Sequence, residues 1–173
     1  RSNHRPIPGA RELLLHLKDL VKLGLVTNGP VDVQTEKIRV SGLEPLLDVV
    51  VISEAVGVAK PDRAIFEEAL RRIGARPEDA VFVGDSWAAD ILGARGCGIR
   101  AVWLNRYGLT SPDARVATEI TALEPIEKVR TELRALNIDT SPFKEYVARR
   151  LDSPGTVERF VRVPVAGYST NQL

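Results

Sequence analysis

Short apolar runs that alternate with helical patterns are the feature that most limits how this 173-residue chain can fold. Residues 49–52 are four apolar residues in a row, as expected for a strand that is buried on both faces. Between such runs, apolar residues recur at the spacing of amphipathic helices. The alternation predicts an α/β fold in which a parallel sheet is flanked by helices in three layers. The predicted strands cover residues 25–26, 49–52, 80–83, 101–104 and 118–123, and the predicted helices cover residues 10–20, 31–40, 64–73, 88–95 and 124–136.

The composition narrows the classes of function. The chain has 24 basic and 23 acidic residues, and a net charge of +1 gives no sign of a surface for nucleic acid or an anionic membrane. No apolar run approaches the roughly 20 residues of a membrane-spanning helix. The single cysteine, Cys97, cannot form an internal disulfide, and between two glycines it is expected to pack rather than to react. We therefore expect a cytoplasmic protein without a nucleic-acid or membrane partner.

Three polar clusters lie at or near the ends of predicted strands, where ligands bind in open α/β sheets. The first is Thr27-Asn28-Gly29, whose backbone N–H groups and Thr27 hydroxyl are placed to face a phosphate-like anion. An ordinary helix-capping turn would use the same residues. The second cluster is Lys60-Pro61, in which proline restricts the lysine backbone while the ammonium group acts as a point charge. The alternative there is a solvated loop lysine.

The third cluster contains two aspartates. Asp85 directly follows the predicted strand 80–83, where a carboxylate is costly unless it is paired or bound to a metal. Asp90 lies about one turn into the next helix. Carboxylate oxygens suit Mg²⁺, which takes one or two protein carboxylates and keeps several waters. The alternative is helix capping by Asp85, with Asp90 near the positive helix end. Of the nearby tryptophans, Trp87 is expected at a substrate entrance and Trp103 in the core.

Taken together, the three clusters resemble the motifs of the haloacid dehalogenase (HAD)-like hydrolase superfamily. Thr27 with Asn28 matches the second motif of that family, Lys60 before proline matches the third, and Asp85 with Asp90 matches the acidic fourth motif. Each motif alone is weak, but their order and spacing also agree. The resemblance covers most of the chain and implies a Rossmann-like core domain over residues 8–136.

The resemblance also implies a Mg²⁺-dependent phosphatase that acts on a small phosphorylated metabolite through an aspartyl-phosphate. Thr27 and Asn28 would hold the transferring phosphoryl group, and Lys60 would neutralise charge between nucleophile and phosphate. Asp85 would bind Mg²⁺, and Asp90 would assist directly or through another ligand. A dehalogenase would not need this magnesium arrangement, so ester hydrolysis is favoured. A phosphomutase or a dehalogenase relative stays open, because the cap domain that sets substrate choice is not among these residues.

One motif of the family is missing from the sequence. The first motif is an Asp-x-Asp pair after an apolar strand, and upstream of Thr27 the only aspartate is Asp19, in a predicted helix. In the family, the first aspartate of the pair attacks phosphorus and the second is the general acid/base. We interpret residues 1–7 as the return from a cap domain, and the motif strand and cap as truncated. We expect this chain to be inactive alone; an inactive remnant or interaction module is the alternative.

Residues 137–173 are predicted to form a C-terminal extension with a helix over residues 143–151. In the family the first-motif strand is central, so its absence would leave two buried strand edges unpaired. We predict that residues 159–165 fill this gap as a substitute strand. Pro164 argues against a central position, because proline removes a donor from the hydrogen-bond ladder.

Overall fold

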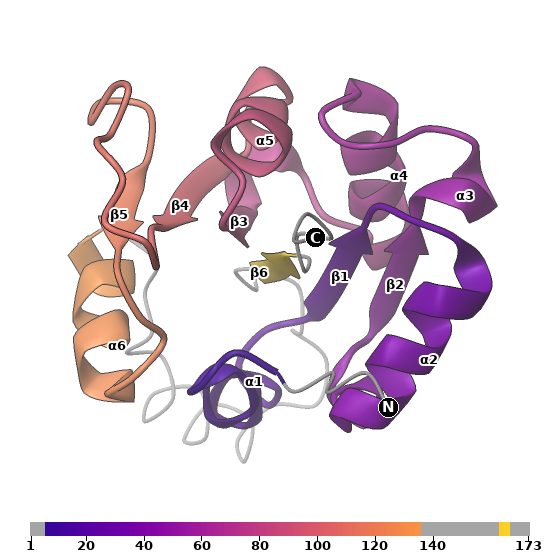
Figure 1. The fold of residues 1–173 in the computed structure, drawn as a ribbon, viewed down its shortest axis with the longest axis horizontal. Coiled ribbons are helices and arrows are strands. Elements are labelled where there is room, and N and C mark those ends of the chain that lie inside the picture. The colour runs from indigo at the N-terminus through magenta and orange to yellow at the C-terminus, as the bar shows by residue number, and fades with distance from the viewer. Residues whose placement is uncertain (1–5, 136–162, 167–173) are drawn as a thin grey trace, which may run out of the picture.

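The computed structural model describes residues 6–135 and 163–166, which form one parallel sheet with helices on both faces (Figure 1). The six strands are arranged in the order β2-β1-β6-β3-β4-β5. This is the three-layer α/β fold that the alternating pattern predicts. The strands are β1 (Leu23–Thr27), β2 (Val49–Ile52), β3 (Val81–Gly84), β4 (Arg100–Leu104), β5 (Thr118–Ile120) and β6 (Val163–Ala166).

The helices are α1 (Ala10–Leu17), α2 (Val31–Ser41), α3 (Ser53–Val56), α4 (Arg63–Ile73), α5 (Gly93–Gly96) and α6 (Ile126–Ala135), with short 3₁₀ turns at Glu44–Leu46 and Pro77–Asp79. Four helices, α1, α2, α4 and α6, lie near their predicted positions, whereas α3 was not predicted. The predicted helix 88–95 is instead split. Its first part is a π-helical turn, η3 (Trp87–Leu92), in which the Ile91 amide donates to the Ser86 carbonyl at 3.2 Å. Such wide turns are frequent at functional sites.

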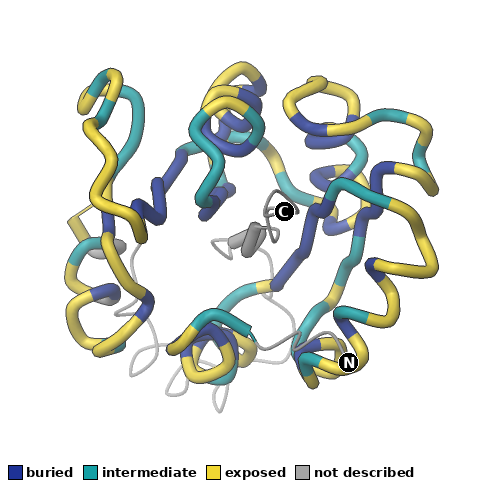
Figure 2. The backbone as a smooth tube through the Cα atoms, in the orientation of Figure 1, coloured by how far each residue is buried: buried dark blue, intermediate teal, exposed yellow. Residues whose placement is uncertain are grey.

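The core consists of one apolar layer on each face of the sheet. On one face α1 and α6 pack against β3 and β4, and on the other face α4 and α5 pack against β1, β2 and β3. The helix predicted at residues 64–73 is amphipathic, as its apolar spacing indicates: α4 has a buried apolar stripe, while the outer helix faces are exposed (Figure 2). The members of this stripe are Ile65, Phe66, Ala69, Leu70 and Ile73. In the described part of the chain, no helix is long and apolar enough to cross a membrane.

The centre of the sheet is occupied by β6, which pairs in parallel with both β1 and β3. The predicted substitute strand is thus confirmed at residues 163–165, and it extends to Ala166. The objection based on Pro164 is wrong, because Pro164 is in register with Gly24 of β1. Among the described residues, β6 and β3 share the single pair Val165 and Val83, so few donors are required on that side. The predicted helix 143–151 and residues 159–162 lie outside the described residues, and the division into residues 1–7, 8–136 and 137–173 stays a prediction.

Candidate active site

The loop after β1 and the loop before α4 are joined by the side chain of Asn28. Its amide nitrogen donates to the Lys60 carbonyl at 3.0 Å, and its amide oxygen accepts from the Lys60 backbone N–H at 2.8 Å. A carboxamide carries one donor group and one acceptor, so it matches both groups of the lysine backbone. Two of the predicted site residues are therefore in direct contact, and Asn28 fixes the backbone position of Lys60.

Lys60 and Asp90 form a buried ion pair. The Lys60 Nζ lies 2.6 Å from Asp90 Oδ1, with the two side chains only 5% and 2% exposed. The other carboxylate oxygen, Asp90 Oδ2, accepts from the Ser86 backbone N–H at 3.0 Å. The Lys60 Nζ also lies 5.6 Å from the ring centroid of Phe82 on β3. Both oxygens of Asp90 are thus engaged by the protein itself.

The carboxylate of Asp85 is in a different situation. It follows β3 directly, it is half-buried, and among the described residues its Oδ1 atom is buried without a hydrogen-bond partner. Burial raises the pKa of Asp85 above its usual value, and the nearby charge of Asp90 raises it further, whereas Lys60 and Arg106 act in the opposite direction. An unpartnered carboxylate oxygen of this kind fits a hard cation such as Mg²⁺.

Two tryptophans support the backbone of Asp85. The indole N–H of Trp103 donates to the Asp85 carbonyl at 3.0 Å. Trp87 packs edge-on against Trp103, with ring centroids 5.0 Å apart and an interplanar angle of 76°. Trp103 is buried, as predicted, and Trp87 is half-buried at the start of η3. The position of Trp87 at a substrate entrance stays a prediction.

Gly84 allows the side chain of Asp90 to lie against the end of β3. A Cβ atom at this position would lie 2.3 Å from Asp90 Cβ and 2.6 Å from Asp90 Oδ2, closer than real contacts permit. Only a glycine therefore lets the Asp90 side chain pack against the end of β3. The sequence argument used Asp85 and Asp90 but missed this role of Gly84. The sequence feature that could have indicated this role is a glycine directly before an aspartate at the end of a strand.

Thr27 lies at the end of β1 and is buried, with 1% of its surface exposed. Its hydroxyl donates to Oε1 of Gln34 on α2 at 3.0 Å. The sequence argument missed Gln34, although it lies four residues before Ile38, the other buried residue of α2. The sequence feature that could have revealed Gln34 is a polar residue on the side of the helix that is expected to be buried.

The backbone N–H groups near Thr27 are less available than predicted. The Gly29 N–H donates to Ser53 Oγ at 2.9 Å, and the Val31 N–H donates to Glu54 Oε2 at 2.6 Å. Ser53 and Glu54 belong to α3, a short helix that the sequence did not predict. For the Gly29 N–H the expectation that it faces an anion is wrong, because Ser53 of α3 supplies its acceptor.

A metal ion at this site would have few protein ligands. Across residues 6–135 and 163–166, no group of three or more histidine, cysteine, aspartate or glutamate side chains could hold a metal ion. Because Mg²⁺ takes only one or two protein carboxylates, a site built on Asp85 agrees with this finding.

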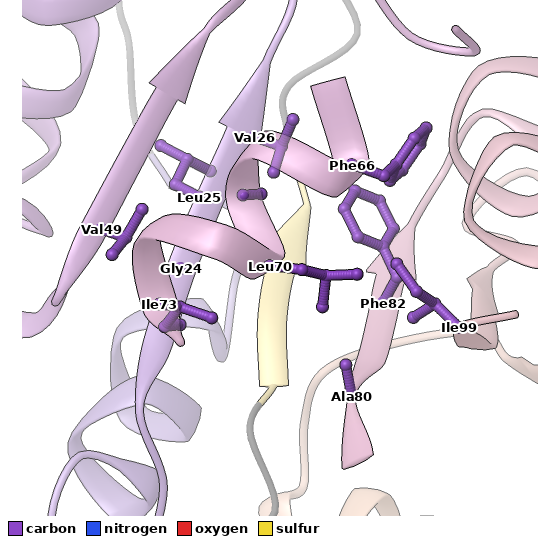
Figure 3. Close-up of a pocket in the computed structure, with 11 residues that line it drawn as sticks. Gly24, Leu25, Val26, Val49, Phe66, Leu70, Ile73, Ala80, Phe82 and Ile99 are labelled. Carbon is purple, nitrogen blue, oxygen red and sulfur yellow. The ribbon is translucent and has the colours of Figure 1, made fainter. Parts of the chain in front are cut away.

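A separate cavity lies between α4 and the strands β1 and β3 (Figure 3). Its lining is apolar and includes Phe66, Phe82 and Ile99. Without polar side chains to orient a ligand, this cavity is a packing gap of the core. The candidate site is therefore the polar cluster at the carboxyl ends of β1 and β3.

Similarity to known proteins agrees with this geometry. The chain is 36% identical over 126 residues to the pyrimidine 5'-nucleotidase YjjG of Escherichia coli, covering 72% of this chain and 56% of that protein. It is 43% identical over 102 residues to the glyceraldehyde 3-phosphate phosphatase of Methanothermobacter thermautotrophicus, and the match covers 58% of this chain and 45% of that protein. The chain thus spans about half the length of these curated relatives.

A solved structure is also similar. The putative HAD-hydrolase YfnB of Bacillus subtilis, solved bound to magnesium, matches with a TM-score of 0.67 and 31% identity, covering 73% of this chain and 56% of that one. A model of the haloacid dehalogenase-like hydrolase family matches residues 1–98. The fold, the ordered site residues and these similarities lead to one conclusion: the chain belongs to the haloacid dehalogenase-like hydrolase family.

Proposed function

We propose that this chain is the core part of a Mg²⁺-dependent phosphatase that hydrolyses a small phosphate monoester through an aspartyl-phosphate. The observation that carries the proposal is the buried, unpartnered Oδ1 of Asp85 beside the Lys60–Asp90 ion pair. The similarity to a pyrimidine 5'-nucleotidase and a glyceraldehyde 3-phosphate phosphatase supports a phosphorylated metabolite as substrate. The magnesium bound to YfnB supports the choice of metal. A cytoplasmic location is part of the proposal and rests on the single cysteine.

Each site residue has a distinct proposed role. Asp85 would bind Mg²⁺, which when bound supplies Lewis-acid polarisation of the phosphoryl group. Asp90 would act indirectly, since both its oxygens are occupied, by holding Lys60 and the backbone of Ser86. The Lys60 ammonium would offset negative charge near the phosphate. Thr27 and Asn28 would position the phosphoryl group, Thr27 through its hydroxyl.

The attacking group is not among these residues. In the family the nucleophile belongs to an Asp-x-Asp pair, and the sequence before Thr27 contains no such pair. We therefore propose turnover for the complete protein and binding of metal and phosphate for this chain. The alternative function, an interaction module without catalysis, is favoured by the same missing motif.

Hydrolysis of a generic aryl phosphate in the presence of Mg²⁺ tests the proposal. We expect no turnover by the chain alone, but binding of Mg²⁺ and inorganic phosphate in calorimetry. Asp85→Ala should abolish this binding, whereas Asp19→Ala, at an exposed position after α1, should leave it unchanged. A chain that binds neither ligand would favour the interaction module.

The gene upstream of the Arg1 codon gives an independent test. An Asp-x-Asp pair after an apolar strand would support the phosphatase. A longer protein with that pair should hydrolyse the aryl phosphate, and Asp85→Ala should remove the activity. An upstream sequence without the pair would support the module.

A further inference from the structure

Gln34 is a polar side chain that the fold buries beside the proposed phosphate site. It is 2% exposed, and its Oε1 accepts the hydrogen bond of the Thr27 hydroxyl at 3.0 Å. Its Nε2 is also buried and has no hydrogen-bond partner among the residues that the structure describes. A buried amide with both N–H donors unused is costly, and an apolar side chain of the same size would avoid that cost. The presence of glutamine here therefore calls for a role.

Gly29 makes room for this amide. A Cβ atom at position 29 would lie 2.5 Å from Gln34 Nε2, and Gly29 has a φ of 136°, which side-chain-bearing residues rarely adopt. The amide of Gln34 thus occupies the space that a side chain at position 29 would need. Gln34 approaches Thr27 on one side and the backbone of Gly29 on the other.

The direction of the Thr27 hydrogen bond matters for phosphate binding. A hydroxyl has one proton, so while Thr27 donates to Gln34 it cannot donate to a phosphoryl oxygen. The two ends of a glutamine amide are nearly equal in size, so a half-turn of the amide exchanges its oxygen and nitrogen without moving its neighbours. After the half-turn, Nε2 donates to Thr27 Oγ1, and the Thr27 proton is free.

We propose that Gln34 is a positioning residue for phosphate binding. With a phosphoryl group bound, the Gln34 amide donates to Thr27 Oγ1 and thereby directs the Thr27 hydroxyl proton toward a phosphoryl oxygen. Without that group, the amide turns back and accepts the same proton. Gln34 acts only through Thr27 and touches no substrate. This inference deepens the proposed function and rests on it.

A double-mutant cycle tests the inference. Wild type, Gln34→Met, Thr27→Val and the double variant are compared for binding of inorganic phosphate in the presence of Mg²⁺, by calorimetry, and for thermal unfolding. Gln34→Met should weaken phosphate binding on the order of 5–10-fold, as expected for one lost hydrogen bond. The melting temperature should change little, because methionine removes the unpaired Nε2 donor but also leaves the buried Thr27 hydroxyl without its acceptor, and the two effects oppose each other. In the Thr27→Val background the same change should have no further effect on binding.

Two results would overturn the inference. The first is a Gln34→Met variant that binds phosphate as tightly as wild type does. The second is a Gln34→Met change that weakens phosphate binding equally in the wild-type and Thr27→Val backgrounds. A second variant, Gln34→Glu, covers the case in which Gln34→Met unfolds. Its ionised carboxylate cannot donate to Thr27, so its deficit relative to wild type should shrink at acid pH, where the carboxyl group regains a proton; a deficit that does not depend on pH would count against the inference.

The proposed function can be contradicted independently of the inference about Gln34. Wild-type protein that binds no phosphate would contradict it. The contact between Thr27 and Gln34 would still be tested by the melting temperatures of the four proteins. If the melting-temperature shifts of the two single variants add up to that of the double variant, the contact between Thr27 and Gln34 is overturned, because residues in direct contact should be coupled.

Discussion

The Lys60 ammonium lies 2.6 Å from the Asp90 carboxylate, and neither side chain has more than a trace of solvent exposure. This ion pair connects the loop before α4 to η3, two segments that are 30 residues apart in the chain. A buried pair of this kind is stable only while both partners are present.

Removal of the lysine charge should therefore strongly destabilise the fold. Lys60→Met leaves the Asp90 carboxylate buried and unpaired, which should lower the free energy of unfolding by about 3–5 kcal/mol in urea titrations. The double variant Lys60→Met/Asp90→Leu should recover much of this loss. Arg39→Met is a suitable control, because the Arg39–Glu36 pair on α2 is exposed and should contribute little. Equal effects at Lys60 and Arg39 would contradict the structural role of the pair.

Asn28 should stabilise the site through its two hydrogen bonds to Lys60. Asn28→Ala removes both bonds and should lower the free energy of unfolding by about 1–2 kcal/mol in urea. It should also weaken phosphate binding, because the backbone of Lys60 loses its attachment to the loop after β1. Wild-type stability and phosphate affinity in this variant would show that other contacts hold Lys60 in place.

The pKa of Asp85 gives a pH-dependent prediction. Because burial raises this pKa, the folded metal-free protein binds the proton more tightly than the unfolded chain does. Ionised Asp85 therefore destabilises the fold at neutral pH, and this cost disappears as the pH falls through the raised pKa. Metal-free Asp85→Asn should melt at a higher temperature than wild type at neutral pH, and the difference should narrow on acidification.

Magnesium should act in the opposite direction, by stabilising wild type but not Asp85→Asn. At a free Mg²⁺ concentration ten times Kd, wild type should gain roughly 1.4 kcal/mol of stability, and Asp85→Asn should gain none. Melting curves with Mg²⁺ and with a chelator measure both effects. Stabilisation of Asp85→Asn by Mg²⁺ would place the metal elsewhere.

Gly84 and Gly96 form a matched pair for a steric test. A Cβ atom at Gly84 would collide with Asp90, whereas at Gly96, in α5, it would meet no atom within 4 Å. Gly84→Ala should lower the free energy of unfolding by about 1–3 kcal/mol, while Gly96→Ala should be neutral or slightly stabilising. Circular dichroism melts distinguish the two. Similar melting temperatures would mean that Asp90 can move away from β3 at little cost.

The position of β6 predicts that residues after 136 contribute to stability. Removal of residues 137–173 would expose the facing edges of β1 and β3 and leave their ladder groups without partners. We expect a loss of at least ~2 kcal/mol in the free energy of unfolding, since each unsatisfied buried group costs ~1–3 kcal/mol. The shortened chain should be compared with the full chain in urea. Unchanged stability would contradict the central place of β6.

The parts of the fold that local pattern determines could be predicted from the sequence. The stripe of α4 is an example, because burial at helical spacing depends on that segment alone. The ends of strands depend on partners that are distant in the sequence, so they were predicted less accurately. Only residues 25–26 were expected in β1, but Leu23 is also in the strand because it is in register with Val163. Similarly, α1 ends at Leu17 where the chain tightens, with the Leu20 amide bonded to the Leu17 carbonyl.

The same distinction holds at the candidate site. Asn28, Lys60 and Asp90 were expected near one edge of the sheet, and the structure connects them by hydrogen bonds. Gln34 and Ser53 were missed, because their roles depend on the groups that they face, Thr27 and the Gly29 amide, and spacing along the chain does not encode those contacts.

Trp87 and Trp103 are the two tryptophans of the chain, and they pack against each other beside Asp85. Their ultraviolet fluorescence therefore originates at a single place, the loop that is proposed to bind the metal. Because an indole emission spectrum responds to nearby charge and polarity, the protein contains its own optical reporter. Occupancy of the metal loop can be followed by fluorescence titration without a label, and stopped-flow mixing can give the rates of binding and release.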